Sequence, residues 1–118
     1  MTPFGAKIRQ LRQDKGMTLS GMAEELGVTP AYLSALEHGR RGRPAPGLVM
    51  QICGVLNLIW DEAAELKQLA KLSHPKVTLD TSGLSPQATE LANRLGKSIR
   101  DLDEDSIAAL LALLPREK

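Results

Sequence analysis

The sequence predicts an all-α protein, and three observations carry that prediction. Apolar residues recur at helical spacing along most of the 118 residues. A hydroxyl residue directly precedes proline at Thr29-Pro30 and Ser85-Pro86, and this pairing of a capping side chain with proline at the first helical position is typical of helix starts. The composition, 42% hydrophobic and 25% charged, is that of an ordinary globular domain.

Three short helices are expected in the first 40 residues. The first spans residues 3–15 and ends at Gly16, because glycine readily terminates helices. The second has Thr18 as its N-cap and ends at Gly27, and the third begins after Thr29. The apolar residues expected on the inner faces of these helices are Ile8, Leu11, Leu19, Met22, Ala23, Leu26, Leu33 and Leu36.

A loop and two more helices complete the first 72 residues. Residues 40–46 consist of Arg, Gly, Pro and Ala, which predicts a loop. The fifth helix is expected to begin near Asp61 as its N-cap, and Phe4 and Trp60 are interpreted as packing residues. The single cysteine, Cys53, excludes an internal disulfide and is interpreted as a small core residue. It belongs to the inner face of the fourth helix, together with Leu48, Val49, Ile52 and Leu56.

Residues 73–84 interrupt the helical pattern. Val77 and Leu79 alternate with polar residues, so we expect a linker with a possible short strand. Residues 85–118 then resume as a two-helix tail, its second helix capped by Asp103. The apolar residues expected to face inward in the tail are Leu91, Ala92, Leu95, Ile99, Ile107, Leu110, Leu111 and Leu114.

The positive charge is concentrated at the front of the chain. The formal net charge is only +1, but residues 1–45 carry seven Lys and Arg against four Asp and Glu, a net +3, and the remainder carries −2. The front is therefore the segment suited to a polyanion. No window has the roughly 18 apolar residues that a membrane span needs, and the start has no apolar signal segment. We expect a cytoplasmic protein with no membrane partner.

The second and third helices have the signature of a helix-turn-helix. They are separated by Gly27, Val28 and Thr29 alone, and a glycine in such a turn tolerates unusual backbone angles. The third helix, residues 29–38, leaves short side chains on its outer face. Such a face fits a helix that enters the DNA major groove, which is about 12 Å wide.

Residues 5–44 resemble the Cro/lambda-repressor (XRE) helix-turn-helix family. The resemblance lies in four segments, namely IRQLR, MAEELGV, SALEHG and the basic loop RRGRP. It implies a five-helix lambda-repressor-like DNA-binding domain over residues 1–72, followed by the linker and the tail. One position departs from the family, because Leu19 with Ser20 beside it stands where many members place a phosphate-contacting glutamine.

The resemblance also implies roles for single residues. The positions that face bases or flanking phosphates are Thr29, Pro30, Ala31, Tyr32, Ser34 and Ala35. The positions expected on the phosphate backbone are Ser20, His38, Arg40, Arg41 and Arg43. Arg12 and Glu37 match a structural ion pair between the first and third helices.

These features predict a sequence-specific regulator of transcription, acting as a repressor. It would bind double-stranded DNA as a homodimer on a palindromic operator, because such domains read half-sites about one turn, roughly 34 Å, apart. No enzymatic activity, cofactor or metal is expected, since no nucleophile with a base, metal-spaced His/Cys set or phosphate-binding glycine loop is present. The alternatives are an antitoxin-type regulator whose tail binds a toxin, and an adaptor that has lost DNA binding. The tail itself could dimerise, bind another protein or extend the core.

Overall fold

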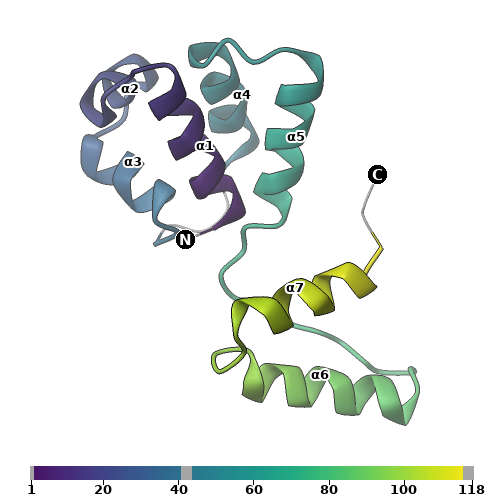
Figure 1. Cartoon of the computed structure of the whole chain (residues 1–118). Helices are drawn as coiled ribbons and strands as arrows, with labels where there is room; N and C mark the ends of the chain where they lie inside the picture. Colours follow the sequence, from purple (N-terminus) through teal and green to yellow (C-terminus); the bar gives the residue numbers. More distant parts are fainter. Residues whose placement is uncertain (1, 41–43, 116–118) are drawn as a thin grey trace. The chain divides into compact units, whose positions relative to one another are not determined.

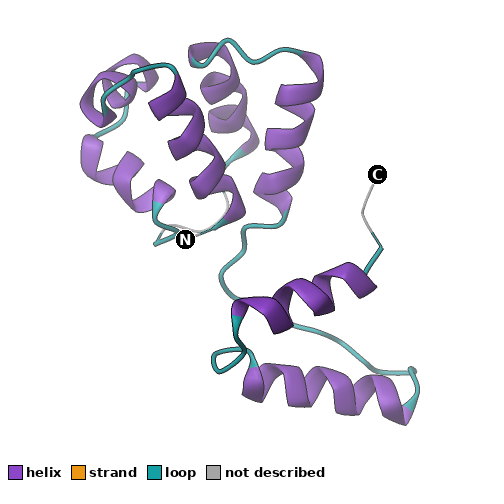
Figure 2. Ribbon diagram, in the orientation of Figure 1, coloured by secondary structure: helices purple, strands orange, loops and turns teal. Residues whose placement is uncertain are grey.

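The structure, a computed structural model, describes residues 2–40 and 44–115. These residues form seven α-helices and contain no strand, which confirms the expected all-α class (Figures 1 and 2). The helices are α1 (Pro3–Asp14), α2 (Leu19–Leu26), α3 (Pro30–Glu37), α4 (Pro46–Val55), α5 (Trp60–Lys71), α6 (Pro86–Ser98) and α7 (Glu104–Leu113). None of them is long and apolar enough to cross a membrane.

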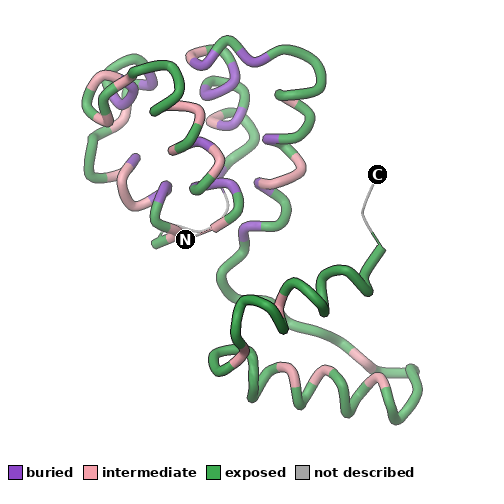
Figure 3. The backbone as a smooth tube through the Cα atoms, viewed as in Figure 1, coloured by how far each residue is buried: buried purple, intermediate pink, exposed green. Residues whose placement is uncertain are grey.

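The chain divides into two compact units. The first runs to Val77 and contains α1 to α5, and the second begins at Thr78 and contains α6 and α7. Every buried residue in the described part of the chain lies between Phe4 and Ser73, and therefore in the first unit (Figure 3). The hydrophobic core thus belongs to α1–α5 alone.

The core of the first unit brings all five helices together. α1 packs against α3 and α5, α2 packs against α3 and α4, and α4 packs against α5. The largest fully buried apolar side chains are Phe4, Ile8, Met22, Leu33, Leu36, Ile52, Leu56 and Leu66. Cys53 is also buried, as expected, and burial raises the pKa of its thiol although the nearby Lys67 opposes the shift.

Two polar contacts connect α1 to the end of α5. The backbone N–H of Phe4 donates to the hydroxyl of buried Ser73 over 3.0 Å, and that hydroxyl donates to the carbonyl of Leu69 over 2.7 Å. An otherwise unpaired amide at the start of α1 is thereby satisfied. Ser73, one residue beyond the expected domain boundary at 72, thus contacts both α1 and α5.

The interpretation of Trp60 as a packing residue is wrong. Trp60 is 86% exposed, and its backbone φ of 39° lies in the left-handed region that bulky residues avoid. α5 begins at this residue, after Ile59 and with no side-chain cap, so Asp61 lies in the first turn and not at the N-cap. Phe4, in contrast, is fully buried as expected.

Residues 73–84 form no strand. A strand needs a neighbour to satisfy its backbone groups, and the described residues offer none. Ordered turns occupy part of this segment instead; the Asp80 carboxylate accepts from the N–H of Ser82 over 2.9 Å, which lowers the pKa of Asp80.

The second unit leaves its apolar faces open. Ala92, Leu95 and Ile107 are half-buried, and no described residue of this unit is buried. The remaining side chains expected to face inward are exposed, namely Leu91, Ile99, Leu110, Leu111 and Leu114. Two short helices cannot enclose an apolar core by themselves, which explains the difference from expectation.

Candidate nucleic-acid interface

The turn between α2 and α3 depends on one glycine. Gly27 caps the C-terminus of α2 with φ 73°, a left-handed conformation that an L-residue adopts with strain. The N–H of Val28 then bonds back to the carbonyl of Ala23, and Thr29 opens α3 in extended conformation. The chain therefore reverses within three residues, which holds the two short helices at a fixed angle.

Threonine caps the N-termini of both helices. The Thr18 hydroxyl accepts from the N–H of Gly21 over 2.9 Å, and the Thr29 hydroxyl accepts from the N–H of Tyr32 over 3.0 Å. Neither helix has an acidic residue in its first turn, where exposed Ser20 lies in α2. The partial positive charge of each N-terminus is thus left available for an anion.

The two faces of α3 differ sharply in character. Leu33 and Leu36 are buried in the core. On the outer face the side chains are short: Thr29, Pro30 and Ala31 are exposed, and Ser34 and Ala35 are half-buried. Tyr32 is half-buried and packs against the core, so its ring contributes to packing as well as to the predicted contact face.

An ion pair fixes α3 to α1. The Nε of Arg12 donates to Oε2 of Glu37 over 2.8 Å and its Nη2 donates to Oε1 over 3.2 Å. The third guanidinium nitrogen, Nη1, donates to the carbonyl of Met17 over 3.0 Å. Glu37 is 1% exposed and is the only acidic residue of α3, so this pair removes all negative charge from the outer face of the helix.

The end of α3 carries two more predicted phosphate contacts. The Nδ1 of His38 lies 2.8 Å from the carbonyl oxygen of Ser34, so this contact holds the ring against the end of α3. Arg40 is exposed, whereas Arg41 and Arg43 lie outside the described residues.

The predicted residues therefore gather on one helix and its flanks. α3 and the α2–α3 turn carry the base-facing set, and the ends of α2 and α3 carry Ser20, His38 and Arg40. No group of three His, Cys, Asp or Glu side chains within the described ranges is arranged to hold a metal ion.

The first half of this chain is similar in sequence to known proteins. The profile of a helix-turn-helix domain family matches residues 3–66. The uncharacterized HTH-type transcriptional regulator RghRB of Bacillus subtilis is 33% identical over 61 residues, which covers 52% of this chain and 44% of that protein. The uncharacterized HTH-type transcriptional regulator YazB of the same organism is 36% identical over 61 residues, 52% of this chain and 87% of that protein.

The same part of the chain also matches a solved structure. It is the crystal structure of SinR, the master regulator for biofilm formation, in complex with DNA, at 31% identity and a TM-score of 0.49. The match covers 54% of this chain and 97% of the solved one. Apart from YazB, this chain spans about half the length, or less, of the curated relatives that it matches.

Proposed function

The chain belongs to the helix-turn-helix domain family, and from that membership we propose that it is a sequence-specific DNA-binding regulator of transcription, acting as a repressor. α3 enters the major groove and the loop at 40–43 contacts phosphates. The outer face of α3 supports this proposal most strongly, because it combines short side chains with the withdrawal of Glu37 into an ion pair. A helix with that face can approach base edges without repelling the phosphates.

The base contacts follow from the side chains available. α3 contains no Arg, Lys, Gln or Asn, so the bidentate contacts to guanine and adenine are absent from this helix. Ala31 and Ala35 contact thymine methyl groups, while Thr29, Tyr32 and Ser34 supply hydroxyls. Specificity then depends on thymine positions and on sequence-dependent DNA shape.

Phosphate contacts supply most of the affinity. Ser20 and the first amides of α2 bind one phosphate, and His38 with Arg40, Arg41 and Arg43 bind others. Each neutralised phosphate releases counterions, so binding weakens steeply as salt rises. A single domain with so few cations binds weakly, which favours a two-fold dimer on a palindromic operator.

The second unit is the element that we assign to dimerisation. This unit exposes more apolar side chains than a monomer of this size needs to leave in water. They include Leu91, Ile99, Leu110, Leu111 and Leu114. Pairing of α6 and α7 with the same helices of a second copy removes these side chains from water.

Selection of bound fragments from a random double-stranded library tests the proposal. The purified full chain should enrich palindromic sites with thymine-rich half-sites about one turn apart. Half-sites with invariant guanines would contradict the assigned base contacts. Failure to enrich any sequence would contradict DNA binding and favour a protein-interaction role.

A matched pair of substitutions tests whether the outer face of α3 contacts DNA. Ala31→Glu places a carboxylate on the outer face of α3, near a helix N-terminus where it does not destabilise the fold. Affinity for the selected site should fall at least about a hundredfold, since each lost contact and the new repulsion act together. Ala64→Glu, on the exposed side of α5, is the control and should leave affinity unchanged.

A further inference from the structure

The segment at the start of α5 exposes its apolar side chains to water. Trp60 is 86% exposed and Ile59 is 66% exposed, and the backbone of Trp60 has a left-handed φ of 39°. Residues held in such conformations cluster at binding sites, and tryptophan is enriched among the residues that dominate interface energetics. Both observations indicate that Trp60 is an anchor for a contact outside its own unit.

Two carboxylates stand beside this anchor. Asp61 and Glu62 occupy the first turn of α5, are exposed, and form no ion pair within the described part of the chain. We call Ile59, Trp60, Asp61 and Glu62 the α5 knob. Its partner must offer an apolar recess with positive charge at the edge.

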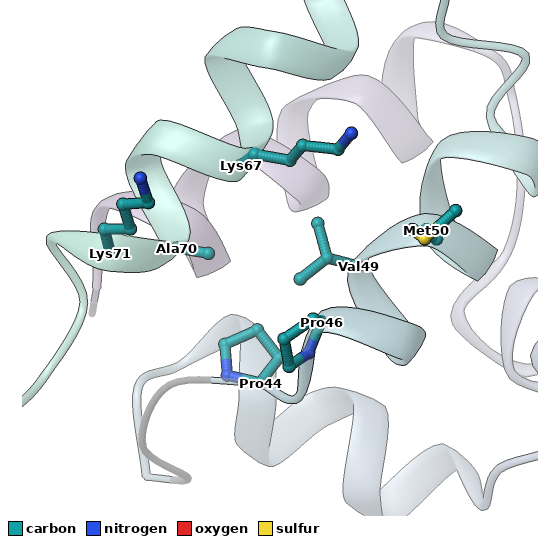
Figure 4. A pocket seen from close by; sticks show the side chains of 7 residues that line it. All are labelled: Pro44, Pro46, Val49, Met50, Lys67, Ala70 and Lys71. Atoms are coloured by element: carbon teal, nitrogen blue, oxygen red, sulfur yellow. The ribbon is translucent and has the colours of Figure 1, made fainter. Parts of the chain in front are cut away.

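The same chain carries such a recess between α4 and α5. A pocket of about 300 Å³ is lined by apolar side chains, among them Pro46, Val49 and Met50, and by Lys67 and Lys71 (Figure 4). Figure 4 shows the Lys67 side chain extended above Val49. Neither lysine has an ion-pair partner among the residues that the structure describes. We call this recess the α4–α5 pocket.

The pocket has room for an indole ring. An apolar cavity of ~150 Å³ accommodates benzene, so a recess twice that size can receive the bicyclic side chain of tryptophan. The charges also match, because two carboxylates flank the knob and two ammonium groups border the pocket.

A knob cannot fill the pocket of its own chain. Trp60 begins α5 and Ala70, which lines the pocket, lies near its end. Ten residues of helix separate the two by about 15 Å, at ~1.5 Å per residue, and the helix is rigid. The occupant must therefore come from another molecule.

We propose that the α5 knob of one copy inserts into the α4–α5 pocket of a second copy. The contact joins different surfaces, so each added copy leaves one free pocket and one free knob, and the association can continue head to tail. One tryptophan buries only about 150–250 Å², well below a stable interface, so the contact is weak in free solution. If the proposed function holds, copies on adjacent sites meet at high local concentration, and the contact makes their DNA binding cooperative.

Trp60 is the only tryptophan of the chain, so tryptophan fluorescence shows whether its indole ring inserts into the pocket. In a concentration series of the full chain without DNA, its emission should move to shorter wavelength as the indole leaves water. Lys67→Glu with Lys71→Glu should abolish the shift, whereas the control, Lys15→Glu with Lys76→Glu, should retain it. Emission of a fully exposed indole at every concentration would overturn the proposal, as would an undiminished shift in the Lys67/Lys71 variant.

A mixing experiment identifies the two halves of the contact. Trp60→Ala has a pocket and no fluorescent knob, while the Lys67/Lys71 variant has a knob and a blocked pocket. Titration of Trp60→Ala, shown to be folded by circular dichroism, into the Lys67/Lys71 variant should restore the shift to saturation. Absence of that response would overturn the proposal. Because no DNA is present, the result does not depend on whether the proposed function is correct.

Discussion

The Arg12–Glu37 pair shows how one buried contact can serve both stability and function. Both carboxylate oxygens of Glu37 accept from Arg12, and no described buried side-chain polar atom lacks a partner. A buried pair of this kind gives little net stabilisation relative to apolar residues, but breaking it leaves an uncompensated charge. Its value here is positional, since it orients α3 and withdraws the carboxylate from the outer face.

Arg12→Ala should therefore be strongly destabilising. Glu37, 1% exposed, would be left without its cation, and the free energy of unfolding should fall by about 3–5 kcal/mol. Lys7→Ala is the control on the same helix, because Lys7 and Glu65 form a 3.5 Å pair that is substantially exposed and worth about 1 kcal/mol at most. Urea unfolding followed by circular dichroism measures both; equal losses would contradict the assigned role of burial.

Gly5 sets the distance between α1 and α3. A Cβ added there would lie 2.5 Å from the carbonyl oxygen of Leu36, and a backbone atom cannot move aside as a side chain can. Gly5→Ala should separate the helices and lower the free energy of unfolding by roughly 1–3 kcal/mol or more, the range for overpacked cores. Gly54→Ala, in α4 with nothing within 4 Å of the added Cβ, should instead stabilise by up to about 1 kcal/mol. Thermal unfolding of the two variants should shift in opposite directions.

The helices show which parts of the fold local sequence determines. Thr18, Thr29, Ser85 and Asp103 were each predictable as N-caps, and each accepts a hydrogen bond from the backbone three residues later. The start of α5 near Asp61 was predicted, but its N-cap was not, because no side chain caps the helix and the unusual φ of Trp60 has no sequence signature.

Contacts between distant residues explain the rest of what the sequence could not show. The outer face of α3 follows from helical spacing and was predictable. The Phe4–Ser73 hydrogen bond joins residues 69 positions apart, and the α4–α5 pocket exists only once two helices pack. No local pattern encodes either feature.

The cap of α7 should be sensitive to acid. Asp103 accepts from the N–H of Ser106 over 2.8 Å. Hydrogen bonding to the Ser106 side chain, together with this backbone bond, lowers the pKa of Asp103 below its ordinary value of 3.8. A carboxyl group whose folded pKa is depressed stabilises at full strength above its unfolded pKa and loses that contribution as pH falls through the folded value. The start of α7 should thus be unchanged at neutral pH and should fray below about pH 4.

The substitution Asp103→Asn distinguishes the effect of the capping carboxylate from effects of other carboxylates nearby. Asparagine keeps an acceptor oxygen and caps equally well, but it does not titrate. In an NMR acid titration the Ser106 amide shift should move in the native chain and stay nearly constant in the variant. An identical Ser106 response in the two proteins would show that the change does not come from Asp103 and would contradict the prediction.

The whole chain separates a core-forming unit from one that exposes apolar surface. The excess of positive charge lies in the same front segment as the helix-turn-helix. No described residue after Ser73 is buried. The near-neutral total charge is therefore an average over a basic unit that contains the helix-turn-helix and a slightly acidic remainder. Only the first has the core needed to fold independently.

Two truncations test this division. A fragment of residues 1–77 keeps Ser73 and should unfold with the same free energy as the first unit of the full chain. A fragment of residues 1–72 loses the acceptor for the Phe4 amide and should be less stable by about 1–3 kcal/mol. Ser73→Ala in the full chain should reproduce that loss. Equal stability of the two fragments would show that the hydrogen bond contributes nothing.

The longer fragment also decides what the second unit does. Residues 1–77 retain the candidate nucleic-acid interface and lack α6 and α7, so the fragment should lose the two-fold dimer in sedimentation and should bind a single half-site as the full chain does. The weak contact between the α5 knob and the α4–α5 pocket remains in the fragment, so the measurement is made on dilute protein. On a paired site it should lose the extra affinity that a dimer gains from linked binding, which reaches 10²–10⁴-fold for linked modules. An unchanged dimer, or unchanged affinity for the paired site, would place the dimer contact in α1–α5 and leave the apolar faces of α6 and α7 to a different partner.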